Sequence, residues 1–235
     1  MLTLDAVHAH YGLSHVLQGL SIEVRAGEVI GLFGRNGVGK TTVMKTIAGW
    51  IAPSSGSVRF DGRDIGGMES DAICRAGVGF VPEDRRIFPG LTVEENLMLG
   101  FMQAPRRARA ASRRKLDSIY QRFPRLAERR AQMGTTLSGG EQQMLAIARV
   151  LAGEPKLLLI DEPTEGLAPM IVDEIFHLMH ELACDGVPIV LVEQNVRRAL
   201  ELTTRFYAIE RGQVVLAGDA SSAADRQALM AAIAV

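Results

Sequence analysis

The chain has 235 residues, of which 47% are hydrophobic and 23% charged, so it is long enough for one substantial core, with or without a small inserted subdomain, and its composition is that of a globular protein. Its formal net charge of -1 provides no overall cationic field for a nucleic acid backbone, which argues against nucleic acid as a partner. The two cysteines, Cys74 and Cys184, are far apart and outside any CxxC spacing, so they indicate neither a disulfide framework nor a zinc site.

The first part of the chain is expected to form short strands separated by turns. Residues 1–10 alternate apolar and polar side chains, which is typical of a strand and unlike a signal peptide. Ala26-Gly27 is predicted to close a hairpin, so we expect an antiparallel β layer over about 2–34. A turn cluster at 53–56 precedes a further strand, which is predicted over 57–60.

A glycine-rich loop follows the apolar run Val29 to Phe33 and precedes a helix predicted over about 40–50. Residues 34–41 of this loop match GxxxxGK[ST], the P-loop pattern. Glycines let the backbone fold around an anion with its N–H groups pointing inward, and the helix N-terminus adds partial positive charge. The pattern therefore predicts that Lys40 reaches the β- and γ-phosphates of a nucleotide and that Thr41 binds Mg²⁺.

From about 91 to 153 the apolar positions follow helical periodicity. Within this region, residues 103–130 carry ten lysines or arginines against two acids, Asp117 and Glu128. Such a run is more often a solvated helical face, and contact with a membrane surface or a partner is the alternative that stays open.

The segment from Leu137 to Gln143 begins one of these helices. Ser138 and Glu141 have the spacing of a capping box. Gly139 and Gly140 stand at the helix start, where each costs about 1 kcal/mol of helix propensity if it lies inside the helix. What two consecutive glycines permit is a close approach of the backbone to a ligand.

After Pro155 short apolar strands alternate with amphipathic helices, which indicates a parallel sheet buried on both faces. The predicted strands are 157–160 and 189–192, and the predicted helices are 169–183 and 196–203. A hairpin turning at Arg211-Gly212 and a short C-terminal helix are expected to follow. No apolar run approaches the roughly 20 residues needed to cross a bilayer, so any membrane step is expected to be made by partners.

Two acids, Asp161 and Glu162, follow the apolar strand 157–160, at the sheet edge where parallel sheets bind ligands. With a P-loop in the same chain, Asp161 is expected to hold Mg²⁺, directly or through water. Glu162 is expected to polarise the attacking water as a general base. These residues therefore predict hydrolysis of the nucleotide that the P-loop holds.

Taken in order, the P-loop, the segment Leu137 to Gln142 and the segment Leu157 to Glu162 resemble the ATPase subunits of ABC transporters, whose signature motif is LSGGEQ. The resemblance covers essentially the whole chain. It implies an α/β fold with a P-loop NTPase (RecA-like) core, an antiparallel β subdomain and an inserted helical subdomain. The core with its β subdomain would comprise residues 1–86 and 154–235, and the helical subdomain residues 87–153.

The resemblance also implies ATP and Mg²⁺ as cofactors. Ser138, Gly139 and Gly140, with Glu141, would contact the γ-phosphate of ATP bound at the P-loop of the opposite subunit, so dimerisation would be part of the active site. Tyr11 takes the position of the aromatic residue that stacks on adenine. The residues implied around the nucleotide of their own chain are Gly34, Arg35, Asn36, Gly37, Val38, Gly39, Lys40, Thr41 and Thr42.

Three positions depart from most relatives. Glu83 stands where the family usually has a glutamine, in a loop that would sense the γ-phosphate, bind Mg²⁺ beside Thr41 and Asp161, and link the site to the membrane subunits. Gln194 stands where most relatives have a histidine; it can donate a hydrogen bond to phosphate but cannot become charged. Ala168 replaces an aspartate, so communication across the dimer would differ in detail.

The segments Pro82-Glu83, Gly166 to Pro169 and Val192 to Asn195 are similar to the branched-chain amino acid importers, in particular to the shorter of their two ATPases. Thr164 to Gly166 is also similar to the urea importers. The implied partners are a second ATPase subunit or another copy of this chain, two membrane-spanning permease subunits and, indirectly, a substrate-binding protein. The chain would lie at the cytoplasmic face of the inner or plasma membrane as a peripheral protein. A urea or amide importer, a lipid or polysaccharide exporter, and a soluble ABC ATPase acting on ribosomes or DNA remain alternatives.

Overall fold

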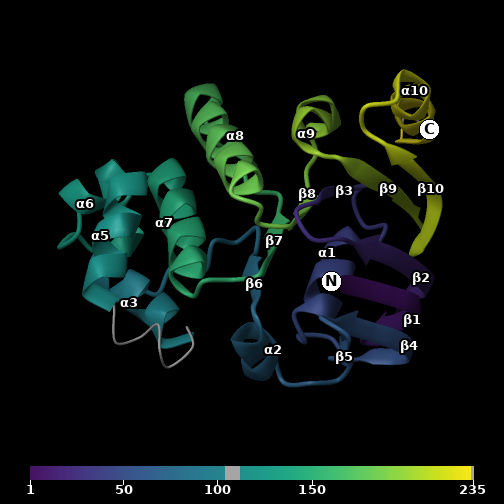
Figure 1. The fold of residues 1–235 in the computed structure, drawn as a ribbon, viewed down its shortest axis with the longest axis horizontal. Helices are drawn as coiled ribbons and strands as arrows, with labels where there is room; N and C mark the ends of the chain where they lie inside the picture. The colour runs from purple at the N-terminus through teal and green to yellow at the C-terminus, as the bar shows by residue number, and fades with distance from the viewer. Residues whose placement is uncertain (104–111, 234–235) are drawn as a thin grey trace.

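The computed structural model describes residues 1–103 and 112–233 (Figure 1). Its strands form one antiparallel sheet of four strands and one mainly parallel sheet of six strands. The smaller sheet has the order β2 (Ser14–Val24), β1 (Leu2–Tyr11), β4 (Pro53–Phe60) and β5 (Arg63–Asp64). The larger sheet has the order β10 (Gln213–Asp219), β9 (Arg205–Glu210), β3 (Val29–Phe33), β8 (Ile189–Val192), β7 (Leu157–Asp161) and β6 (Val78–Val81).

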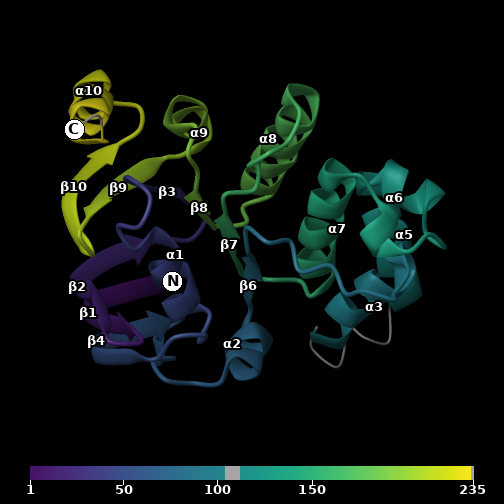
Figure 2. The same cartoon turned by 180° about the vertical axis from the view of Figure 1, so that it is seen from behind.

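The helices fall into a group beside the sheets and a group at one end of the molecule (Figures 1 and 2). Beside the sheets lie α1 (Lys40–Ile47), α2 (Ser70–Ala76), α8 (Pro169–Cys184), α9 (Val196–Leu202) and α10 (Ala223–Ile233). The end group contains α3 (Val93–Gln103), α5 (Ser112–Arg122), α6 (Pro124–Glu128), the 3₁₀ turn Gly134–Thr136 and α7 (Gly139–Ala152). In the described part of the chain, no helix combines the length and the apolar character needed to span a bilayer.

The expected hairpin at Ala26-Gly27 is wrong. These residues carry the chain from the smaller sheet to the larger one, where β3 pairs in parallel with β8 and β9. The hairpin of this region turns at Gly12-Leu13, between β1 and β2. All five residues of β3 are buried, and a strand buried on both faces belongs in a parallel sheet rather than in a half-exposed hairpin.

Other element boundaries also differ from the predictions. The expected turn at 53–56 belongs to β4, since Pro53 and Ser55 pair with Ala9 and His8 of β1. The helix α1 stops before Gly49, whose φ of 75° ends it early. The elements α2 and β6 were not predicted. The other predicted strands, the helices α8 and α9, the turn at Arg211-Gly212 and the C-terminal helix are confirmed.

Alternate residues of the central strands face two different cores. In β8, Ile189 and Leu191 belong to the core that includes residues of α7, α8 and α9, whereas Val190 and Val192 belong to the core formed with α1 and the antiparallel sheet. The parallel sheet is therefore buried on both faces, as its apolar strands predict. This packing brings the C-terminal ends of β3, β7 and β8 side by side near the start of α1.

The basic segment 103–130 is partly described. Residues 104–111, with three of its arginines, lie outside the described residues. Four of its described basic side chains form ion pairs with acids of the same chain. These pairs are Lys115–Glu154, Arg122–Asp185 at 2.6 Å, Arg125–Glu174 at 3.6 Å and Arg129–Glu141 at 2.7 Å. Part of the positive charge of this segment is therefore paired with acidic side chains of the same chain.

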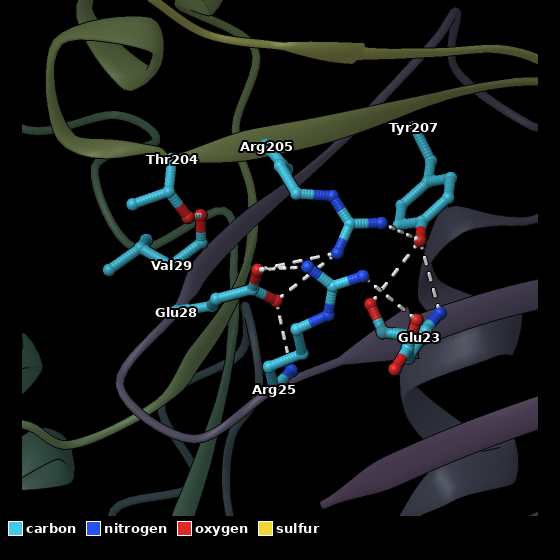
Figure 3. Close-up of polar contacts among 7 residues, drawn as sticks. All are labelled: Glu23, Arg25, Glu28, Val29, Thr204, Arg205 and Tyr207. Carbon is cyan, nitrogen blue, oxygen red and sulfur yellow. Dashed lines mark hydrogen bonds and ion pairs between the residues drawn. The ribbon is translucent and has the colours of Figure 1, made fainter.

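A polar network fastens the antiparallel sheet to β9 of the larger sheet (Figure 3). The Glu28 carboxylate accepts a hydrogen bond from the Arg25 N–H at 2.9 Å and pairs with Arg205 at 3.3 Å. The Tyr207 hydroxyl accepts hydrogen bonds from Arg205 Nη2 at 2.8 Å and from the Glu23 N–H at 3.1 Å, and donates one to the Glu23 carbonyl at 3.3 Å. One buried hydroxyl therefore joins the two sheets.

We expect Tyr207→Phe to lower the free energy of unfolding by about 1–3 kcal/mol, because it leaves the partners of a buried hydroxyl unpaired. Urea denaturation would measure the change. Tyr11→Phe is the matched control: Tyr11 is 63% exposed, and its hydroxyl should contribute less than about 0.5 kcal/mol. Equal midpoints for the two variants would show that the network does not stabilise the fold.

Candidate active site

The glycine-rich loop joins β3 to α1 at the C-terminal edge of the larger sheet. Gly34 has a φ of 149°, and a Cβ atom there would lie 2.3 Å from the carbonyl oxygen of Ile209, so a side chain does not fit. The Gly212 N–H donates to the Val38 carbonyl at 2.9 Å and anchors the loop to the β9–β10 turn. The first N–H groups of α1 have no partner within the helix and provide donors for an anion.

Lys40, the first residue of α1, is only 5% exposed. Its Nζ donates to the carbonyls of Gly34 at 2.9 Å and Arg35 at 3.0 Å, so the ammonium group closes the loop on itself. Burial lowers the pKa of Lys40, and the nearby carboxylates of Glu162 and Asp161 oppose that shift. A buried cation whose hydrogen bonds within the described part of the chain go to neutral carbonyls is well placed to exchange them for an anionic ligand.

Asp161 ends β7 and is completely buried. Among the described residues, neither of its carboxylate oxygens has a hydrogen-bond partner of normal geometry. Burial raises its pKa to about 6, the charges of Glu162 and Glu83 add to this, and Thr41 and Lys40 oppose it. An unpartnered buried carboxylate beside a threonine hydroxyl is a donor set suited to a hard cation such as Mg²⁺.

This raised pKa has a cost in stability. Because folded Asp161 holds its proton more tightly than the unfolded chain does, ionisation costs nothing below about pH 4, and its full cost is present above about pH 6. We therefore expect Asp161→Asn to raise the free energy of unfolding by up to about 3 kcal/mol at neutral pH, in protein free of nucleotide and Mg²⁺. Urea denaturation at about pH 4.5 and about pH 7 would test this. A difference between the two proteins that does not grow with pH would contradict it.

Glu162 follows Asp161 in a strained backbone conformation. Its φ of 45° lies in the left-handed region, which non-glycine residues seldom adopt outside over-determined sites. The Glu162 N–H donates to the Val192 carbonyl of β8 at 2.9 Å. Gln194 Nε2 donates to Glu162 Oε2 at 2.5 Å, which fixes the orientation of the carboxylate. Two neighbouring strand ends thus determine where this acid points.

Glu83, Glu162 and Glu165 bring their carboxylate oxygens within 4.8 Å of one another. The contact with Glu162 raises the pKa of Glu165, and Glu83 adds to the effect. The structure therefore places Glu83 in a carboxylate cluster. The negative charge of Glu83 also contributes to the raised pKa of Asp161. Such mutual repulsion is relieved when a cation binds nearby.

A cleft of about 590 Å³ connects these groups. Its lining joins Tyr11, Glu83, Glu162 and Gln194 to the loop and to α1. The loop and helix residues that line it are Asn36, Gly37, Gly39, Lys40, Thr41, Thr42 and Lys45. Tyr11 is exposed, and Lys45 Nζ lies 5.7 Å from the centre of its ring.

The segment that begins α7 does not line this cleft. Ser138 caps α7: its hydroxyl accepts from the Glu141 N–H at 3.4 Å while the Glu141 carboxylate accepts from the Ser138 N–H at 2.9 Å, so the predicted capping box is present. A Cβ atom on Gly140 would lie 2.6 Å from Ile171 of α8, and one on Gly139 would lie 3.1 Å from Arg85. These glycines thus have a packing role besides any role in binding.

Sequence reasoning missed two residues that organise the site. Glu193 is buried; it accepts hydrogen bonds from the Thr164 hydroxyl at 2.5 Å and from the Asn195 N–H at 3.3 Å, which ties together the loops after β7 and β8. The sequence signal for Glu193 was the position of an acid directly after an apolar strand. Arg149 of α7 donates to the carbonyls of Arg85 at 3.0 Å and Arg86 at 2.8 Å, in the loop that carries Glu83. No local sequence pattern predicts the contact of Arg149 with this loop, because the residues are far apart in the chain.

The sequence profile of the family described as ABC transporter matches residues 17–165, more than half of the chain. The chain belongs to the ABC transporter family. The matched range includes the P-loop, the segment that caps α7 and the pair Asp161-Glu162. This confirms the resemblance and the P-loop NTPase fold, and the chain is an ATP-binding ATPase of that family.

Its ABC relatives include the high-affinity branched-chain amino acid transport ATP-binding protein BraG of Pseudomonas aeruginosa, 44% identical over 92% of this chain and 91% of that protein. The lipopolysaccharide export system ATP-binding protein LptB of Haemophilus influenzae is 32% identical over 93% of this chain and 90% of that protein. Among solved structures, a dimeric ATP-binding cassette in a post-hydrolysis state with ADP and Pi has a TM-score of 0.82 at 25% identity, covering 94% of this chain and 99% of that one.

Proposed function

We propose that this ABC ATPase energises the uptake of a branched-chain or other small amino acid through separate membrane-spanning subunits. The observation that carries the proposal is the 44% identity with BraG, which extends over nearly the full length of both chains. The identity with LptB is lower, at 32%. Glu83, Ala168 and Gln194, the three departures from most ABC ATPases, support the same assignment.

We propose that Thr41, Asp161 and Glu83 hold Mg²⁺ beside the nucleotide. The unpartnered oxygens of Asp161 and the repulsion among Glu83, Glu162 and Glu165 support this. When bound, Mg²⁺ neutralises charge on the phosphates. Lys40 would exchange the carbonyls of Gly34 and Arg35 for phosphate oxygens.

In the proposed reaction Glu162 takes a proton from the attacking water. Gln194 acts by positioning this carboxylate, since its amide donates to Glu162 at 2.5 Å and carries no ionisable proton of its own. Tyr11 would present its exposed ring to the adenine, with Lys45 beside it. The loop 34–39 and the first turn of α1, with Thr42, would supply the remaining phosphate contacts.

The proposed active unit is a dimer. Ser138, Gly139, Gly140 and Glu141 lie outside the cleft of their own chain, so they would complete the cleft of a partner, either a second copy of this chain or a homologous ATPase. The solved relative described above is a dimer. Closure of two such chains on ATP would move two permease subunits, and a substrate-binding protein would deliver the amino acid to them.

We further propose that the chain sits at the cytoplasmic face of the membrane as a peripheral subunit. The division into residues 1–86 with 154–235 and residues 87–153 also remains a proposal, supported by the grouping of α3, α5, α6 and α7 at one end of the molecule (Figure 2). Arg149 joins this group to the loop that carries Glu83, which offers a path from the nucleotide to the permeases.

The test is affinity purification of the full chain from membranes, with identification of the chains that copurify. We expect two multi-span permeases and a homologous ATPase, and ATP hydrolysis by the complex that rises when a binding protein loaded with a branched-chain amino acid is added. Copurification with lipid-export components, with ribosomes, or with no membrane protein would overturn the importer assignment. Stimulation only by urea or an amide would overturn the choice of substrate.

A further inference from the structure

Three of the five histidines of the chain, His8, His10 and His15, gather where β1 and β2 join. His8 Nδ1 lies 3.0 Å from His15 Nε2. The His10 ring is stacked on the His15 ring, with centroids 4.4 Å apart and planes within 7° of parallel. His10 and His15 are exposed and His8 is half-buried, so the cluster lies on the outer face of the antiparallel sheet, outside the ATP cleft.

The backbone places these rings on one face through an irregularity in pairing. His8 and His10 are two residues apart on β1, so they share a face. His15 is two residues from the buried Leu17, and regular alternation would turn it inward. However, the register shifts between the pairs Ala9–Leu17 and His10–His15, which leaves Val16 as an extra residue and turns His15 to the face of His10.

The His8 ring packs against Gly19 of the neighbouring strand. Gly19 of β2 has a φ of 80°, and a Cβ atom there would lie 3.4 Å from His8 Nε2. The His8 ring lies over β2, with Nδ1 directed at His15 and Nε2 at Gly19. A Cβ atom at this distance would be in ordinary van der Waals contact, so it is the positive φ, and not the His8 ring, that favours glycine here.

The distance between the two nitrogens is close to that of two ligands on one metal ion. At metal–nitrogen distances of about 2.0–2.1 Å, tetrahedral geometry separates two imidazole nitrogens by roughly 3.3 Å. His8 and His15 already hold theirs at 3.0 Å, with one nitrogen turning its lone pair toward the other. Replacing the shared proton by a cation requires the two rings to separate slightly and to tilt, so that both lone pairs converge on the ion instead of facing each other along one line.

We propose that His8, His10 and His15 form a binding site for a divalent cation that prefers imidazole, such as Zn²⁺. His8 and His15 supply the first two ligands. The His10 ring lies parallel to the His15 ring and is exposed, so its side chain would turn to become the third ligand, and water would complete the coordination. The bound ion would tie β1 to β2 close to Tyr11, the last residue of β1 before the turn.

The test uses the full chain without a histidine tag. Zn²⁺ is titrated in competition with a chromophoric chelator, with Mg²⁺ in excess to occupy the carboxylates of the ATP cleft, since oxygen ligands suit Mg²⁺ and imidazole suits Zn²⁺. We expect one tight Zn²⁺ per chain, and a loss of affinity of at least about tenfold in His8→Ala and in His15→Ala. Zn²⁺ should raise the Tm of the unsubstituted chain and not that of the variant carrying both changes.

The control is the double substitution His177→Ala and His180→Ala, which removes the other two histidines. These lie exposed on α8, where His180 Nδ1 is 3.7 Å from Cys184 Sγ and offers a competing metal pair. Zn²⁺ affinity should be unchanged in this control. Loss of binding in the α8 variant, unchanged binding after His8→Ala and His15→Ala, or no binding by the unsubstituted chain would each overturn the proposal. Far-UV circular dichroism of every variant shows whether a loss reflects unfolding.

Discussion

Glu162→Gln is expected to leave ATP binding intact while lowering the rate of ATP hydrolysis by about 10²–10⁴-fold. The substitution removes the proposed base but preserves the side-chain volume and an oxygen to accept the hydrogen bond from Gln194. It also removes one negative charge from the cluster with Glu83 and Glu165, so the affinity for ATP should not fall. With hydrolysis stopped, ATP-bound chains should accumulate as a closed dimer.

Phosphate release measures the rate, and size-exclusion chromatography with ATP and Mg²⁺ measures the dimer. Glu201→Gln on the exposed face of α9 is the matched control, because it makes the same chemical change outside the cleft. Undiminished turnover in Glu162→Gln would remove that residue from the role of base. A loss of ATP binding would show instead that the carboxylate is needed to hold the site together.

Lys40→Ala is expected to fail at the earlier step, nucleotide binding. Each hydrogen bond from a buried ammonium to a phosphate oxygen is worth about 1.5–3 kcal/mol, so the affinity for ATP should fall by about tenfold to more than a hundredfold. The substitution also removes the hydrogen bonds to the Gly34 and Arg35 carbonyls that close the loop in the absence of nucleotide. Hydrolysis should then be lost because little ATP is bound.

Isothermal titration calorimetry with ATP gives the affinity, and Lys156→Ala is the control. Lys156 is exposed and pairs with Asp61 at 3.4 Å, outside the cleft. The two substitutions in the site are expected to separate binding from catalysis: Glu162→Gln binds ATP but turns it over very slowly, whereas Lys40→Ala binds it much more weakly. A Lys40→Ala protein with unchanged affinity would mean that the loop backbone alone holds the phosphates.

Several parts of the site could be predicted from short segments of sequence. The P-loop needs glycines at fixed positions, the cap of α7 needs Ser138 and Glu141 three residues apart, and a buried strand followed by Asp161-Glu162 delivers acids to a sheet edge. In each case the residues that form the feature lie within one turn of helix, one loop or one strand end. Local sequence is therefore sufficient, and the structure contains each of these local arrangements.

Other parts depended on which strands become neighbours. Ala26-Gly27 has the composition of a hairpin turn, yet β3 lies in the other sheet because its fully apolar side chains need neighbours on both faces. The contact of Gln194 with Glu162 exists only because β8 lies beside β7. The clustering of Glu83 with Glu165 likewise joins residues from different strand ends.

The sequence by itself determined the motif chemistry of this ABC ATPase: a loop for phosphates, a buried acid at a strand end, a candidate base beside it and a capped helix with two glycines. Only the tertiary structure decided how these groups act on one another. It gave Glu162 its left-handed backbone and its partner Gln194, left Asp161 buried with no hydrogen bond of normal geometry from the described residues, and turned His15 toward His8 through one extra residue in β2. The reason is physical: capping and loop geometry act over a few residues, whereas burial, charge repulsion and strand register depend on residues that are distant in the chain.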